Sequence, residues 1–171
     1  MLDVPYQRRA RRNGLTVYGA IGFTVSALVH FGSYIGHTIH PENPLFWLLH
    51  IGIFPLFFAF VFRLRAWQAT RRGMFGFRQA QLRWRELLAY VPMWVPPLVA
   101  LLFAYVMVNF FVAMSHLASG GTTSGPSSTE ALYTVRAFSG HWLIFYALPT
   151  LFFAFVPADA RPASLPQDAA V

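Results

Sequence analysis

The sequence predicts an all-α integral membrane protein, a bundle of four transmembrane helices with both termini in the cytoplasm. Of the 171 residues, 56% are hydrophobic and 11% are charged, whereas soluble domains carry about 25% charged residues. Four apolar segments reach, or in one case approach, the roughly 20 residues that a helix needs to cross the hydrocarbon core. Arginine-rich stretches alternate with arginine-poor connections between these segments.

The four predicted spans run over residues 15–35, 45–62, 87–114 and 137–156. The second and fourth are close to the shortest length that spans a bilayer, so they need little tilt. Residues 1–14 then form a basic cytoplasmic N-terminus, residues 15–156 the membrane domain, and residues 157–171 a flexible cytoplasmic tail.

The distribution of arginine predicts the orientation. All thirteen basic side chains are arginine: four precede the first span, seven lie within residues 63–85, and one is in the tail. The positive-inside rule places these three regions in the cytoplasm. Arg136 departs from the pattern, because it follows the connection between the third and fourth spans. Arginine without lysine, in an alanine-rich chain, indicates a GC-rich genome, so we expect a bacterial inner membrane.

The connection at residues 63–86 mixes arginine with aromatic residues, and both suit the lipid headgroup layer. We expect an amphipathic helix on the membrane surface, broken near Gly73 and Gly76. The alternative is an ordinary cytoplasmic loop that carries the topology charges. A membrane surface accounts for the net charge of +7, so no nucleic-acid partner is expected. The residues assigned to this surface are Arg63, Arg65, Trp67, Arg71, Arg72, Arg78, Arg83, Trp84 and Arg85.

Prolines interrupt three of the spans. Pro55 and Pro149 are expected to kink the second and fourth spans, since each removes a helical N–H donor. The pair Pro96 and Pro97 is expected to bend or break the third span. Such a bend is either a simple change of direction or the opening of a crevice for a lipid or quinone.

A hexapeptide repeat suggests that the bundle consists of two repeated helical hairpins. The sequence Leu-Phe-Phe-Ala-Phe-Val occurs at residues 56–61 and again at residues 151–156. The alternative is coincidence in a chain with 18 phenylalanines. If the repeat is real, it relates His50 to His141 and His37 to His116, and related side chains can face each other across a compact bundle.

Histidine supplies the candidate chemistry, since neutral imidazole binds haem b and several metals. His50 and His141 form the first candidate pair for a haem or pigment, and His30 with His50 the second. All three are expected at similar depth near the outer face. The alternative for His30 and His50 is a hydrogen bond to Ser26, Ser33, Tyr34 or Asn109 of a neighbouring helix.

Metal binding is a further hypothesis for the remaining outer histidines. His37 and His40 are three residues apart, a spacing that lets two side chains share a metal on one helical turn. His116 is the third candidate metal ligand. The alternative is that all three are exposed in or beside loops, where imidazole needs no ligand.

Several classes of function are disfavoured. The absence of cysteine excludes disulfides, thiolate metal sites, Fe–S clusters and c-type haem. No Asp or Glu lies inside a predicted span, although ion-coupled transporters and proton pumps commonly need one there. No nucleotide-binding, zinc-protease or catalytic-triad motif occurs. We therefore expect no independent catalytic activity.

The leading hypothesis is a small accessory or structural subunit of a larger bacterial membrane complex, in electron transfer or photosynthesis. Its expected partners are other membrane subunits and lipids, with quinone or pigment rings as further candidates, because the phenylalanine-rich surfaces suit them. One alternative is a redox membrane protein that binds haem b or a metal through the outer-leaflet histidines. Another is a lipid- or quinone-binding membrane protein.

Overall fold

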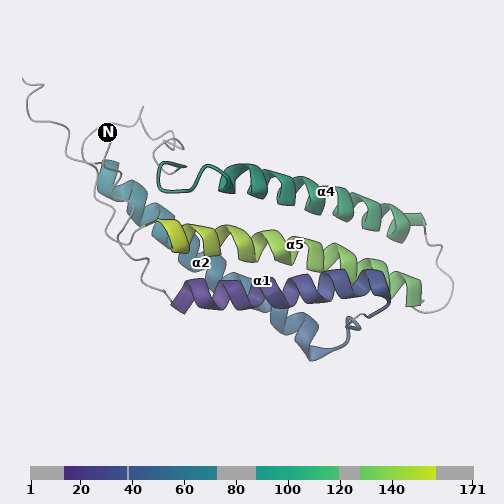
Figure 1. Cartoon of the computed structure of the whole chain (residues 1–171). Coiled ribbons are helices and arrows are strands. Elements are labelled where there is room, and N and C mark those ends of the chain that lie inside the picture. Colours follow the sequence, from purple (N-terminus) through teal and green to yellow (C-terminus); the bar gives the residue numbers. More distant parts are fainter. Residues whose placement is uncertain (1–13, 38, 73–87, 120–127, 157–171) are drawn as a thin grey trace, which may run out of the picture.

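The computed structural model describes residues 14–37, 39–72, 88–119 and 128–156, and in these residues the regular elements are all helical. The elements are α1 (Gly14–Gly32), the short 3-10 helix η1 (Ser33–Ile35), α2 (Pro44–Arg72), α4 (Val95–Ser119) and α5 (Ser128–Phe155) (Figure 1). All four long helices are long and apolar enough to cross a membrane, and they pack as a bundle. The predicted all-α bundle of four long apolar helices is confirmed, and the chain is a multi-pass membrane protein with four candidate spans.

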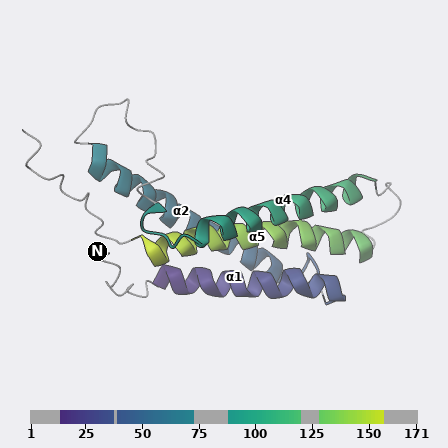
Figure 2. The ribbon, with the colours of Figure 1, turned by 45° about the horizontal axis from the view of Figure 1, so that its top comes forward.

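α5 is the central helix of the bundle. It packs along α1 and α4 and also contacts α2, whereas α1 touches α2 only slightly, and α2 and α4 make few contacts or none. In Figures 1 and 2, α1, α4 and α5 run side by side while α2 crosses them at an angle. A symmetric pair of hairpins would pack α4 on α2 as α1 packs on α5. The packing therefore does not follow the symmetry of the predicted hairpin repeat.

Two helices extend beyond the apolar spans that the sequence predicts. α5 begins at Ser128 rather than at residue 137, and α2 continues to Arg72 rather than ending at residue 62. The first part of the predicted membrane-surface segment, with Arg63, Arg65, Trp67, Arg71 and Arg72, is thus the last part of α2. Its second part, with Arg78, Arg83, Trp84 and Arg85, lies outside the described residues, as do residues 1–13 and 157–171.

The two adjacent prolines begin a helix instead of bending one. Pro96 and Pro97 follow Val95, the first residue of α4. N–H groups in a first turn have no helical acceptor, so proline is well tolerated there. The third span is thus broken just before this pair, since residues 89–94 are not helical and the helix starts at Val95. A crevice for a lipid or quinone at this position stays a prediction.

Pro55 lies inside α2, as predicted, and two tyrosines donate hydrogen bonds to carbonyls in the two turns that precede it. The Tyr18 hydroxyl donates to the Gly52 carbonyl at 2.7 Å, and the Tyr146 hydroxyl donates to the Leu49 carbonyl at 2.8 Å. The carbonyl that Pro55 leaves without a helical donor is that of Ile51, four residues earlier. The two tyrosine bonds therefore do not replace the lost bond, and they link α2 to its neighbours. Tyr18 and Tyr146 therefore hold α2 against α1 and α5.

Small residues let α1 approach α5 closely. Gly19, Gly22 and Ser26 are buried on one face of α1, at the three- and four-residue spacing of a helical stripe. A Cβ atom added at Gly22 would lie 2.2 Å from the Tyr146 ring, and one added at Gly19 would lie 1.9 Å from Thr150 Oγ1. Close contact through small residues is a common basis of helix association in lipid, where apolar burial gives little driving force.

The main apolar core lies between α2 and α5 and positions the candidate site. Trp142, Phe46 and Leu56 are fully buried there. The rings of Phe46 and Trp142 meet edge to face, with centroids 4.9 Å apart. His50 follows Phe46 by about one turn on α2, so this core holds His50 against α5.

Candidate functional site

Three of the six histidines lie within the bundle at one level, as the sequence predicts. His30 of α1 lies beside Ser139 of α5, and His141 follows two residues later on α5. The ring of His50 from α2 lies 6.4 Å from the ring of His141. His30, however, makes its ring contacts with Phe31, Tyr34 and Tyr105. The structure thus brings His50 and His141 together and places His30 in a separate cluster.

His30 is fully buried, and both of its ring nitrogens are hydrogen-bonded. Nδ1 lies 2.8 Å from Ser139 Oγ, and Nε2 lies 2.7 Å from the Tyr105 hydroxyl. Ser139 donates its single hydroxyl proton to the Val135 carbonyl. Its oxygen therefore accepts from Nδ1–H of a neutral His30, and the Tyr105 hydroxyl donates to Nε2.

This arrangement gives His30 a role in joining helices. Its two hydrogen bonds connect α1 with α4 and α5 in the interior of the bundle. Haem ligation by His30 would require one of these bonds to be broken, and it stays a prediction. Tyr105 and Ser139 were missed by sequence reasoning as partners of His30, because nothing in the local sequence brings three separate helices into register.

Arg136, the exception to the arginine pattern, has internal partners. Its Nη2 atom donates to the Ser33 carbonyl at 3.0 Å, and its guanidinium carbon lies 4.3 Å from the centre of the Tyr34 ring. The Tyr34 hydroxyl donates to Asn109 Oδ1, and Asn109 Nδ2 donates to the Arg136 carbonyl. A cation beside the last carbonyls of a helix and over an aromatic face is stabilising. Arg136 therefore joins η1, α4 and α5 at the end of the bundle that the other described arginines do not occupy.

The His50–His141 pair lies in an aromatic cluster formed by α2, α4 and α5. Both imidazoles are half-buried, and their planes meet at 67°. Trp142 Nε1 donates to His50 Nδ1 at 3.1 Å, and His141 Nδ1 lies 3.1 Å from the Ala137 carbonyl. Phe138 contacts both rings, with centroids 5.4 Å from His50 and 5.7 Å from His141.

The two hydrogen bonds assign opposite tautomers to the two neutral rings. An indole N–H only donates, so His50 Nδ1 is an acceptor and the ring proton is on Nε2. A carbonyl only accepts, so His141 Nδ1 carries the proton and Nε2 holds a lone pair. His50 Nε2 is thus a donor and His141 Nε2 an acceptor.

This pairing bears on the predicted haem ligation. A haem iron binds a nitrogen lone pair, which His141 Nε2 offers and His50 Nε2 does not while Trp142 donates to its other nitrogen. Ligation by both rings would require His50 to lose its bond with Trp142. Haem or pigment binding by His50 and His141 stays a prediction.

The three histidines predicted as metal ligands have separate surroundings. His37 Nδ1 lies 3.3 Å from the Ile35 carbonyl, and His40 Nδ1 lies 3.7 Å from a carboxylate oxygen of Glu42. The His116 ring stacks on Tyr133 of α5, with centroids 4.2 Å apart. Among the described residues, no group of three or more His, Cys, Asp or Glu side chains is placed to hold a metal ion. A metal role for His37, His40 and His116 stays a prediction.

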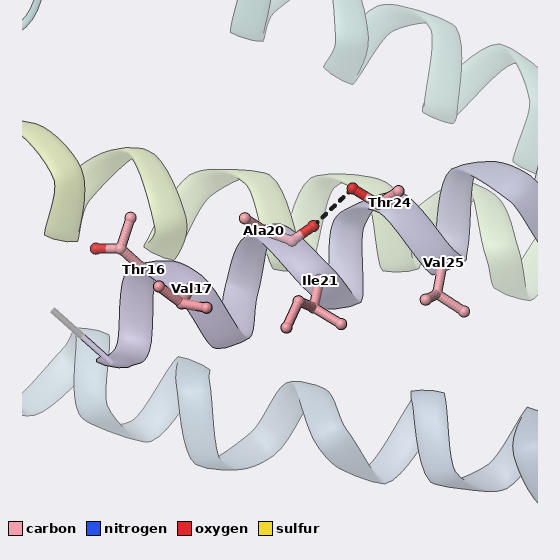
Figure 3. Close-up of a pocket in the computed structure, with 6 residues that line it drawn as sticks. All are labelled: Thr16, Val17, Ala20, Ile21, Thr24 and Val25. Carbon is pink, nitrogen blue, oxygen red and sulfur yellow. Dashed lines mark hydrogen bonds between the residues drawn. The ribbon is translucent and has the colours of Figure 1, made fainter. Parts of the chain in front are cut away.

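A shallow concavity on α1 offers little chemistry. Figure 3 shows its lining, which comes from α1 alone. The Thr24 hydroxyl there donates to the Ala20 carbonyl of its own helix at 2.9 Å. The lining residues are Thr16, Val17, Ala20, Ile21, Thr24 and Val25. The concavity is therefore part of the apolar outer surface of α1.

Comparison of the chain with protein-family models, with curated proteins and with solved structures finds no match. The class of protein is therefore defined by the chain's own features. It is a four-span membrane bundle with a central helix, α5, that carries a buried polar network on one face and a histidine pair in an aromatic cluster on another.

Proposed function

We propose that the protein is a small accessory subunit whose outer helices pack against other subunits of a larger membrane complex. The observation that carries this proposal is the uneven burial of the four spans. In the most apolar stretch of α5, 56% of the residues are buried within the chain, against 22% for α2 and 17% for α4. α2 and α4 thus leave most of their surface to lipid or to partner helices.

The exposed side chains of α4 suit a helical partner. Leu101, Phe103 and Phe111 are large, apolar and more than half exposed. Close packing of such side chains against another helix is one of the main sources of association in a membrane. The deeply placed polar side chains His30, Asn109 and Ser139 make hydrogen bonds within the chain. This internal pairing favours a structural role over a substrate path.

Photo-crosslinking in cells tests the subunit role. With a photoreactive benzoylphenylalanine in place of Leu101, Phe103 or Phe111, we expect a discrete crosslink to a second polypeptide. The same residue at Phe152, which is buried inside the bundle, is the matched control and should give no intermolecular product. Absence of any crosslink from the three α4 positions, with isolation of a monomer that has its own activity, would overturn the proposal.

We also propose that the protein resides in a bacterial inner membrane with both termini in the cytoplasm. The start of α1 and the arginine-rich end of α2 lie at the same end of the bundle (Figure 1). Arg136, which would oppose this orientation, is engaged in hydrogen bonding inside the chain. The positive-inside rule then favours the arginine-rich end as the cytoplasmic one. The parent complex, in electron transfer or photosynthesis, remains the expectation from the sequence.

Single-cysteine labelling tests this orientation cleanly, because the chain has no cysteine of its own. Glu42→Cys, in the connection between α1 and α2, should react with an impermeant maleimide added to intact spheroplasts. Arg65→Cys, exposed near the other end of α2, should react only after the membrane is opened. The reverse pattern would contradict the proposed orientation.

A further inference from the structure

We propose that the His50–His141 pair binds the hydroxyl group of a membrane-soluble aromatic molecule, with a phenol- or quinol-type head group. The proposal rests on the hydrogen bonds and ring contacts of these two side chains. It does not depend on the subunit role, which concerns the outer surfaces of α2 and α4.

The two rings together require a ligand that both accepts a hydrogen bond and donates one. His50 Nε2 offers a proton, and His141 Nε2 offers a lone pair, since their other nitrogens are engaged by Trp142 and Ala137. A hydroxyl group can accept the first hydrogen bond and donate the second through one oxygen. A carbonyl or an ether oxygen can only accept, which leaves His141 unpaired in an apolar environment.

The distance between the rings suits a shared oxygen. Their centroids are 6.4 Å apart, and each ring nitrogen lies about 1 Å from its own ring centre. This spacing is too long for a direct hydrogen bond between the two rings, and it accommodates one hydroxyl oxygen about 2.8 Å from each nitrogen when both Nε2 atoms face the gap.

The surroundings favour an aromatic ligand over an aliphatic one. Phe54 of α2 lies 6.1 Å from the His50 ring, and Phe110 of α4 lies 6.2 Å from the His141 ring. Phe145 of α5 lies 6.0 Å from His141 and, like Phe54, is exposed at the surface. Aromatic rings attract one another in edge-to-face and offset arrangements. Because α2 and α4 are separated on α5, a ring can reach the half-buried histidines from the lipid.

Ligand binding to the unmodified chain in lipid nanodiscs tests the proposal directly. We expect para-octylphenol to bind saturably and at least about tenfold more tightly than para-octylanisole, whose methyl ether oxygen accepts but does not donate. Nitrogen NMR of labelled histidines should show a shift at His50 and His141 on binding the phenol. Equal binding of phenol and ether would overturn the proposal and indicate that water alone bridges the two rings. Equal binding of decanol and the phenol would overturn the aromatic part.

Variants of the pair provide a second line of evidence. His141→Phe removes the acceptor but keeps an aromatic ring, so it should lower the affinity for the phenol about tenfold and leave the affinity for the ether unchanged. His116→Phe is the matched control, because His116 stacks on Tyr133 away from this cluster, and it should bind the phenol like the unmodified chain. Full phenol affinity in His141→Phe would overturn the proposal.

Discussion

Replacing Gly22 by leucine is expected to separate α1 from α5 and to destabilise the bundle by at least about 3 kcal/mol, the upper end of overpacking effects. A Cβ atom at this position would already lie 2.2 Å from the Tyr146 ring. Tyr146 is buried and its hydroxyl donates to the Leu49 carbonyl, so the ring cannot move aside without losing that bond. The measurement is the free energy of unfolding in mixed micelles, followed by helicity and by tryptophan fluorescence.

Gly14→Ala is the matched control for this prediction. Gly14 is in the same helix, and an added Cβ there would meet nothing within 4 Å. The control should change stability by no more than about 0.5 kcal/mol, as surface substitutions usually do. Native-like stability of Gly22→Leu would show that α1 and α5 do not approach each other through this face.

Replacing His30 by alanine is expected to cost about 2–4 kcal/mol, because it leaves a cavity and breaks two interhelical hydrogen bonds. The side chain is fully buried and bonds Ser139 and Tyr105 on two other helices. The same micelle unfolding experiment measures the loss. His116→Ala, at an exposed position near the end of α4, should cost less than about 0.5 kcal/mol.

A double-mutant cycle separates the hydrogen bonds from the cavity. In the His30→Ala background, Tyr105→Phe should have a smaller effect than in the unmodified chain, since the bond from the Tyr105 hydroxyl to Nε2 is already lost. Fully additive effects of the two substitutions would contradict the proposed pairing. A ligand role for His30 would instead make the cost of His30→Ala depend on whether the ligand is present.

The existence of the four helices could be predicted because a long apolar stretch has few alternatives in a membrane. Three of their ends could be predicted to within one residue, since α1 starts at Gly14, α2 starts at Pro44 and α5 ends at Phe155. The end of α2 and the start of α5 could not. Residues 128–136 are too polar to count as part of a span, yet they continue α5 as a helix. The hydropathy pattern places Pro96 and Pro97 inside the third span. The structure starts the helix at Val95, so both prolines lie in its first turn.

The sequence predicted that His50 and His141 can lie together, but it did not predict which hydrogen bonds their ring nitrogens make. The repeat related His50 to His141, and the structure brings the two rings together. Which nitrogen of each ring carries the proton depends on Trp142 and on the Ala137 carbonyl. His30 looks equivalent to the other two in sequence, yet Ser139 and Tyr105 take both of its nitrogens. Such partners come from other helices, and a hydropathy pattern carries no information about them.

The central position of α5 has a consequence for the order of assembly. α5 follows α1, α2 and α4 along the chain, so the ribosome delivers it after all three. Until then the glycine face of α1 and polar side chains such as His30 and Asn109 have no partner on α5. We therefore expect α1, α2 and α4 to stay loosely associated in the membrane until α5 is inserted. A nascent chain that stops before Ser128 should then be a substrate for membrane proteases.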